Sequence, residues 1–260
     1  MAPGTSAPRR VLGVDLATEP ARTGLVEATW RDGAWRVAGP YPGDDATILE
    51  RAAGSAVGLD APLGWPDAFV EAVDAHHARR PWPEGVDAVD LRYRATDRFV
   101  VDLDLGVRPL SVSSDLIGAV AWRAAGLVAS LGRVAGRPLA RDGSDGVYEV
   151  YPAAALRAWG LLARRGERYK GRRVAEPGAR ALRRRIVTDL AAGVVGPVAL
   201  AEGLDGAAVD SDHVLDAIVA ALVVTAALAG ATYPPPAALA ARAAREGWIH
   251  VPRGAPTGGR

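Results

Sequence analysis

One segment near the carboxyl end restricts the fold of this chain more than any other, because it is almost wholly apolar yet begins with acids. Residues 210 to 230 read DSDHVLDAIVAALVVTAALAG, with Asp210, Asp212 and Asp216 at the head. The apolar run from 214 to 229 is rich in alanine and short for a membrane span. We therefore predict a long helix that is buried against a sheet.

The three acids at the head of this helix are not equivalent. With 3.6 residues per turn, Asp212 and Asp216 share one face, which apolar residues such as Leu215 flank. An acid in the first turn is favoured by the helix dipole, and Ser211 or Asp210 could be the N-cap. These structural roles account for Asp210 and could account for Asp212. Asp216 lies beyond the first turn, so we predict that Asp212 and Asp216 face inward and have a functional role.

The rest of the chain predicts an α/β fold. The run RVLGVDLA (10–17) is typical of a buried strand, and two alternating runs around Asp32 and Gly33 predict a hairpin. The further predicted elements are a helix at 44–56, a strand at 56–66, helices near 67–79 and 113–132, a strand and helix over 146–160, a helix at 176–193 and a short strand at 247–252. A hairpin followed by crossovers predicts a mixed sheet with its first strand near the centre.

Carboxylates follow two of these predicted strands. Asp15 ends the first strand, and Asp60 ends the strand that contains VGLD. Each acid alone could make a turn or cap the next element. If the two strands are parallel neighbours, the carboxylates lie side by side at the carboxyl edge of the sheet, where α/β proteins bind ligands. Glu149, in the strand before Pro152, either faces outward or joins this group.

A convergence of these acids would require cations to offset their repulsion. The chain has no cysteine and four histidines, so oxygen ligands for Mg²⁺ or Mn²⁺ fit better than a thiolate or histidine-rich site. Two such ions about 4 Å apart can activate a water and stabilise the leaving oxygen in phosphodiester hydrolysis. We predict metal ligation by Asp15, Asp60, Glu149, Asp212 and Asp216, with all but Glu149 also catalytic.

Four motifs carry a family resemblance; in chain order they are VLGVDLA, GLDAPLGWP, YEVYPAAAL and DHVLDAIVAAL. Together they resemble a family of predicted nucleases with the ribonuclease H fold, catalogued as a domain of unknown function, over most of residues 10 to 252. The resemblance implies a ribonuclease H-like mixed five-stranded sheet in the order 3-2-1-4-5, with strand 2 antiparallel and helices on both faces. It also implies metal ligation by Asp15, Asp60, Asp212 and Asp216.

The segment from 64 to 145 departs from that family pattern. It is much longer than the link in a minimal ribonuclease H domain, so we predict an irregular insertion there, and Glu149 would replace or supplement a usual ligand. We expect a single ribonuclease H-like domain over 9–252. Flexible tails, rich in glycine, proline and small polar residues, are expected at 1–8 and 253–260.

The basic residues give the chain no strong electrostatic footprint for nucleic acid, because the net charge is only +1. Basic clusters at 92–98, 164–173 and 183–185 either contact phosphates or form a solvated surface. Arg94 and Arg98 fall in the irregular stretch near the expected site. We predict that these two bind a nucleic acid or nucleotide substrate.

Three functions stay open at this point. The leading hypothesis is a metal-dependent nuclease, and the second is a non-catalytic binding or scaffold protein with the same fold, which would bind no divalent metal. The third, an actin-like or sugar-kinase-like ATPase, needs a duplicated domain and a second Gly-rich phosphate turn, and the sequence has no visible duplicate. Since the first residues lack the apolar stretch of a secretory signal, we expect a cytoplasmic protein without a membrane partner.

Overall fold

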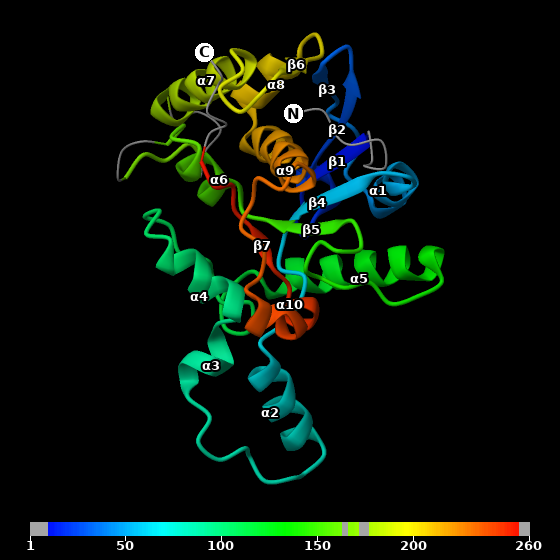
Figure 1. Cartoon of the computed structure of the whole chain (residues 1–260), viewed down its shortest axis with the longest axis vertical. Coiled ribbons are helices and arrows are strands. Elements are labelled where there is room, and N and C mark those ends of the chain that lie inside the picture. The colour runs from blue at the N-terminus through cyan, green and yellow to red at the C-terminus, as the bar shows by residue number, and fades with distance from the viewer. Residues whose placement is uncertain (1–9, 163–165, 172–176, 255–260) are drawn as a thin grey trace.

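The structure is a computed structural model that describes residues 10–162, 166–171 and 177–254. A mixed sheet of seven strands forms the centre of this part of the chain, in the order β6-β3-β2-β1-β4-β5-β7 (Figure 1). β1 pairs antiparallel with β2 and parallel with β4, so the first strand is central, as predicted. The strands are β1 (Arg10–Asp15), β2 (Gly24–Arg31), β3 (Ala34–Ala38), β4 (Ala56–Asp60), β5 (Val147–Val150), β6 (Val198–Leu200) and β7 (Ile249–His250).

The predicted count of five strands is wrong. β6 lies beside β3 and β7 beside β5, so the complete order also differs from the predicted one. β7 is the short strand expected within 247–252, which the five-stranded order left out, whereas β6 has only three residues and leaves no alternating pattern in the sequence. The five inner strands follow the order β3-β2-β1-β4-β5, in which β2 alone runs opposite to β1. The general α/β class is confirmed.

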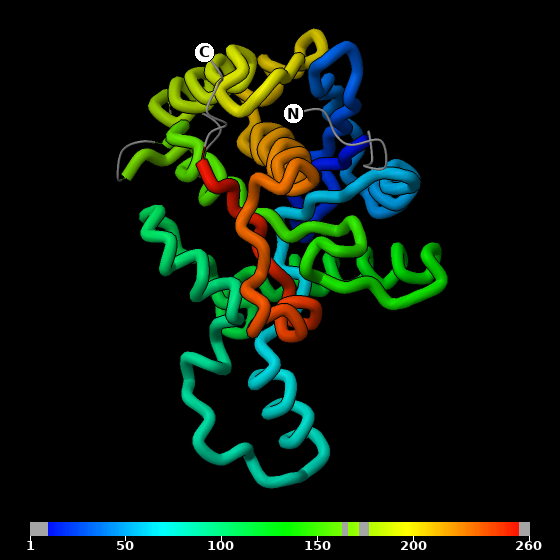
Figure 2. Tube along the Cα trace, in the orientation of Figure 1, coloured from blue at the N-terminus to red at the C-terminus, as the bar shows by residue number. Residues whose placement is uncertain are grey.

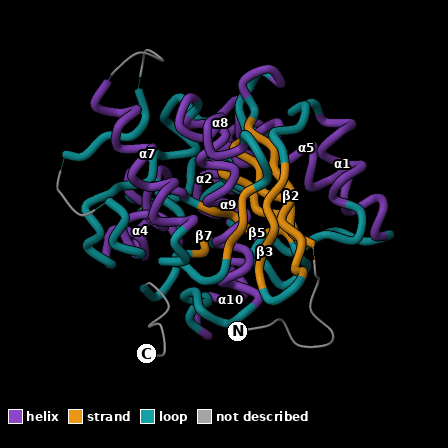
Figure 3. The backbone as a smooth tube through the Cα atoms, turned by 90° about the horizontal axis from the view of Figure 1, so that it is seen from above, coloured by secondary structure: helices purple, strands orange, loops and turns teal. Residues whose placement is uncertain are grey.

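Helices cover both faces of this sheet, and Figure 3 shows them on either side of the strands. Val11 of β1 packs in one core with the helices of the first face, and Leu12 and Val14 pack in a second core with those of the other. The first face is covered by α6 (Pro152–Ala158), α7 (Pro177–Ala191), α8 (Leu204–Asp210) and α9 (Asp212–Leu228), and the second by α1 (Asp45–Ala52) and α5 (Gly118–Ala135).

The apolar helix α9 lies unusually close to the sheet because glycines face it. A Cβ atom on Gly13 would stand 2.1 Å from the carbonyl oxygen of Ala217, and one on Gly24 would stand 2.0 Å from that of His213. Both distances are far below van der Waals contact, so only glycine fits between these strands and the helix backbone. The same close approach sets how far the acids of α9 lie from the strand ends.

Gly13→Ala is therefore expected to destabilise the protein by about 1–3 kcal/mol or more, because the added methyl group must push α9 away from β1. The matched control is Gly126→Ala in α5, where a Cβ would meet nothing within 4 Å. That control should gain up to about 1 kcal/mol from helix propensity. Urea unfolding of both variants measures the difference, and equal stability of Gly13→Ala and the parent would contradict the close approach.

Among the described residues, no single helix is both long and apolar enough to cross a membrane. α8 and α9 meet that criterion only as a pair, and they meet at a bend of 119°. α9 is itself buried over most of its length, from Val214 to Val224. Its apolar surface is thus accounted for by packing within the protein.

The predicted insertion is largely helical. α2 (Asp67–His77) and α3 (Ala88–Arg92) extend away from the sheet (Figure 1, Figure 2), and α4 (Ala95–Asp102) lies beside α10 (Ala240–Glu246). The helix predicted at 113–132 begins only at Gly118, because the serines before it bond to α3 instead. The hydroxyl of Ser111 donates to the carbonyl of Arg92 (2.7 Å), and that of Ser113 donates to the carbonyl of Leu91 (2.6 Å).

His250, in β7, is buried and makes the stability of the folded protein depend on pH. Its Nε2 lies 3.0 Å from the carbonyl oxygen of Asp142, and its ring packs edge-on against Tyr148. Burial lowers the pKa of His250 to about 4. Because the unfolded chain binds a proton at a pKa near 6.5, the neutral folded form loses stability as the pH falls from about 6.5 towards 4.

We expect this histidine to cost about 2 kcal/mol of stability when the pH is lowered from 7 to 5. The measurement is the free energy of unfolding in urea at both pH values, for the parent and for His250→Gln. The variant should lack this part of the pH dependence, whereas His77→Gln, at an exposed position on α2, should retain it. A His250→Gln curve parallel to that of the parent would contradict the neutral buried state.

Candidate metal centre

Two strand ends bring a pair of carboxylates together. Asp15 and Asp60 are the last residues of β1 and β4, and they are direct register partners in that parallel pair. Gly13 and its partner Gly58 both face α9. Since side chains alternate along a strand, Asp15 and Asp60 also point towards the α9 side of the sheet.

Asp216 completes the cluster from α9. The helix runs antiparallel to β1, with the Ala217 backbone over Gly13 and the first turn over the end of the strand. One carboxylate oxygen from each of Asp15, Asp60 and Asp216 lies within 4.8 Å of the others. The Asp216 residue is 1% exposed and Asp15 is 8% exposed. This buried group could hold a metal ion, and it unites three acids that the sequence analysis singled out.

The pKa values of Asp216 and Asp60 are raised, as expected for buried acids in a site that needs a cation. Burial raises the pKa of Asp216 to about 6; Lys170 opposes this shift, and the charge of Asp15 adds to it. The pKa of Asp60 lies well above its usual range, again because of burial, with Lys170 opposing and Asp15 adding to the shift. A bound cation would offset this repulsion and return both groups to the ionised form.

Lys170 brings a positive charge into the cluster. Its Nζ lies 2.6 Å from Oδ2 of Asp216 and 3.8 Å from Oδ2 of Asp60. The hydroxyl of the preceding residue, Tyr169, donates to Oδ1 of Asp216 (2.7 Å) and is buried. Sequence reasoning placed Lys170 only within a general basic cluster. The signal that could have found it is composition, because it is the single lysine among 31 basic residues.

His213 is a second residue that sequence reasoning missed. Its Nδ1 lies 2.5 Å from Oδ2 of Asp15, and about a third of its side chain is exposed. The hydrogen bond to Asp15 raises the pKa of His213, so the ring carries its proton to a higher pH than usual. The contact fixes the Asp15 carboxylate, and the position of His213 in the sequence between two expected ligands was the available clue.

Asp212 is not among the acids that lie within 4.8 Å of one another in the described residues. It is the first residue of α9, whereas Ala217 already lies over Gly13, so Asp212 stands about one turn beyond Asp216 and past the end of β1. Ser211 is the N-cap, and its hydroxyl accepts from the backbone N–H of Val214. The inward orientation predicted for Asp212 therefore does not bring it into the cluster.

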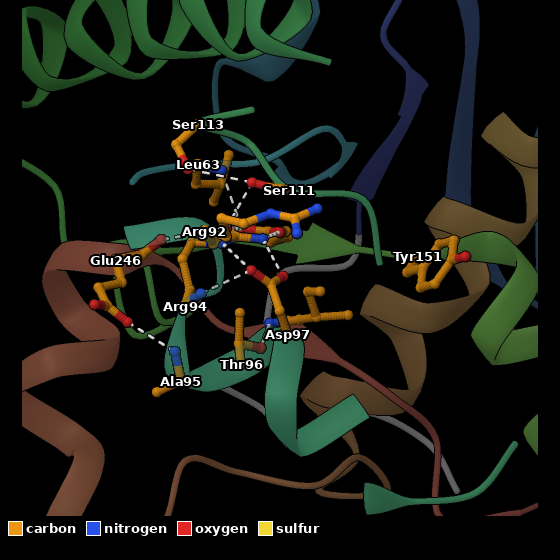
Figure 4. A network of polar contacts seen from close by, with 12 residues as sticks. Leu63, Arg92, Arg94, Ala95, Thr96, Asp97, Ser111, Ser113, Tyr151 and Glu246 are labelled. Atoms are coloured by element: carbon orange, nitrogen blue, oxygen red, sulfur yellow. Dashed lines mark hydrogen bonds and ion pairs between the residues drawn. The ribbon is translucent and has the colours of Figure 1, made fainter. Parts of the chain in front are cut away.

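Glu149 and Arg94 form a buried ion pair with each other. Both guanidinium Nη atoms of Arg94 lie 2.7 Å from the two carboxylate oxygens of Glu149, and Arg94 also bonds Asp97 (Figure 4). The Glu149 carboxylate accepts a further bond from the backbone N–H of Leu63 (3.0 Å). Arg94 also donates to the carbonyl of Glu246, which joins α4 to α10. Glu149 and Arg94 are thus brought near the acids, but engaged with each other.

Arg98, the other arginine predicted to contact substrate, forms a partly exposed ion pair with Asp90. The basic cluster predicted at 164–173 is only partly described, because residues 163–165 and 172–176 lie outside the described residues, whereas the cluster at 183–185 lies within α7. Within the described part, Arg183 is buried and bonds the carbonyl oxygens of Val209 (2.8 Å) and Tyr169 (2.7 Å). Arg183 therefore supports the segment that carries Lys170.

A cavity of about 380 Å³ opens beside the acidic cluster. Its polar lining comes from Asp15, Asp60, Lys170, Arg94 and Glu149. Apolar residues of the insertion form another part of the wall; they are Leu110, Ile117 and Val120. A cavity with convergent charged groups and an apolar wall is the usual form of a ligand site, and here it lies at the carboxyl edge of the parallel strands.

The fold and the site together define a class: a mixed α/β protein with a buried carboxylate cluster and a ligand-sized cavity at the carboxyl edge of its sheet. A family model described as "Protein of unknown function (DUF429)" matches residues 13–247, so the chain belongs to that family. The matched range includes the second half of β1, both strand-end acids and the whole of α9. Comparison with curated proteins and comparison with solved structures gave no match.

Proposed function

We propose that this protein is a divalent-metal-dependent phosphodiesterase, a nuclease that acts on nucleic acid or nucleotide with Mg²⁺ or Mn²⁺. The observation that carries the proposal is the convergence of Asp15, Asp60 and Asp216 beside an open cavity. Three carboxylates and no thiolate form a donor set of hard oxygens, which suits these two ions. The order of the five inner strands supports a ribonuclease H-like fold, and we keep a cytoplasmic location as part of the proposal.

In this proposal, each residue of the site has a separate role in metal binding, positioning or the exclusion of water. Asp15, Asp60 and Asp216 would hold the ion, which supplies Lewis-acid stabilisation of the phosphoryl oxygens and lowers the pKa of a bound water. His213 fixes the carboxylate of Asp15 through its Nδ1. The apolar wall formed by the insertion would exclude bulk water from one side of the substrate.

The test is hydrolysis by the purified full-length protein with Mg²⁺ or Mn²⁺, on single strands, duplexes, RNA–DNA hybrids and branched junctions, and on a small activated phosphodiester. We expect metal-dependent cleavage of at least one class, abolished by a chelator and restored by adding the ion. Binding of a nucleic acid without cleavage of any substrate would favour the non-catalytic alternative. No metal binding and no cleavage would overturn the proposal.

A further inference from the structure

Lys170 reaches the acidic cluster from the solvent side. Its side chain is 48% exposed, yet its ammonium lies against the buried carboxylate of Asp216 and close to that of Asp60. It also lines the cavity beside the cluster. Tyr169, directly before it, is buried and bonded to the other oxygen of Asp216. The backbone at this point is therefore anchored, and the ammonium is held at the cluster rather than free in solution.

The charge balance of the cluster limits how many ions it can take. Three carboxylates and one ammonium leave two negative charges, which one divalent cation neutralises. A second divalent cation would leave the buried site with two excess positive charges before any substrate is bound, against one in a site without the ammonium, and excess charge is costly away from water.

The ammonium occupies one end of the acidic cluster, against Asp216. Both oxygens of Asp216 are engaged, Oδ1 by Tyr169 and Oδ2 by Lys170, so Asp216 retains only its remaining lone pairs for a metal. On the other side, Asp15 and Asp60 are register partners at adjacent strand ends and offer oxygens to a common ion. The cluster is thus asymmetric, with carboxylates at one end and an ammonium at the other.

We propose that Lys170 takes the place of a second metal ion, so that the site binds one divalent cation per chain and the ammonium contacts the phosphate of the substrate. This inference rests on the proposed function and replaces the two-ion mechanism that the sequence analysis predicts. An ammonium has three donors, and the two carboxylates nearest to Lys170 use two at most, which leaves one for an anionic oxygen in the cavity.

The experiment is a titration of the full-length protein with Mn²⁺. Calorimetry gives the number of ions bound per chain, and electron paramagnetic resonance shows whether the bound ions are coupled to each other. The parent should bind one Mn²⁺ and give the six-line signal of an isolated ion. Lys170→Ala, which removes the charge and vacates the space, should bind two and give a spin-coupled signal. Lys170→Arg, which keeps the charge, should bind one. Arg168→Ala, at an exposed position two residues earlier, should match the parent.

Circular dichroism checks that each variant is folded before titration. Two ions in the parent would overturn this inference while leaving the nuclease proposal intact, and one ion in both the parent and Lys170→Ala would show that Lys170 does not set the count. One ion in the parent and two in Lys170→Ala, without hydrolysis of any substrate, would support this inference and remove the nuclease proposal. No bound ion in the parent would overturn both.

Discussion

Asp15→Asn is expected to lower the rate of metal-dependent hydrolysis by at least about a thousandfold. The substitution keeps the size of the side chain but removes a charged oxygen that lies within 4.8 Å of Asp60 and Asp216. Loss of about 4 kcal/mol of metal-supported transition-state stabilisation corresponds to this factor. The asparagine can still accept a hydrogen bond from His213, so the fold should be retained. The measurements are kcat/KM on the best substrate and the affinity for Mn²⁺.

The matched control is Asp210→Asn, at the last residue of α8 and six residues before Asp216. Asp210 forms an exposed ion pair with Arg180 and should give parental rates. Asp212→Asn, which alters a carboxylate outside the cluster, should lose far less than Asp15→Asn. If Asp15→Asn cleaved as fast as the parent, or if Asp212→Asn were the more damaging change, the assignment of ligands would be wrong.

Arg94→Met is expected to reduce the free energy of unfolding by about 3–5 kcal/mol, because it removes one partner of a buried charge network. Arg94 is 1% exposed. Burial alone would lower its pKa, but the carboxylates of Glu149 and Asp97 outweigh that effect and hold the pKa above its usual value. Methionine fills much of the same volume, so the loss reports the two carboxylates left buried without their cation. The network also joins α4 to β5 and α10.

Arg98→Ala supplies the control for Arg94, since both lie at the start of α4 and both pair with an aspartate. The pair between Arg98 and Asp90 is about 40% exposed on each side, so its loss should cost no more than about 1 kcal/mol. Urea unfolding at neutral pH measures both variants. Equal effects of Arg94→Met and Arg98→Ala would mean that the buried network contributes no more than a surface ion pair.

The part of the site that could be predicted from the sequence is the part encoded by regular structure. Asp15 and Asp60 each end a run of apolar residues, and strand alternation with parallel pairing is enough to place them together. Asp216 lies beyond the first turn of an apolar helix, so neither capping nor the helix dipole explains it. The hairpin at Asp32 and Gly33 follows from local turn chemistry, and both residues have positive φ.

The part that could not be predicted depends on contacts between distant segments. Glu149 has a carboxylate that could bind a metal. Whether it binds a metal or pairs with Arg94 depends on a contact between residues 55 positions apart in the sequence. Lys170 reaches the acids from a loop rather than from a strand or helix, so no periodicity points to it. The separation of Asp212 from the cluster depends on how far α9 slides along β1, which the contact at Gly13 sets.

The most direct test of the central claim is the anomalous diffraction of crystals grown or soaked with Mn²⁺. The account predicts an anomalous peak bonded to Asp15, Asp60 and Asp216, with Lys170 beside it in the cavity. Direct bonds from the three carboxylates to this peak would identify these acids as ligands. At saturating Mn²⁺, a peak elsewhere in the molecule, or none among these three acids, would contradict the account.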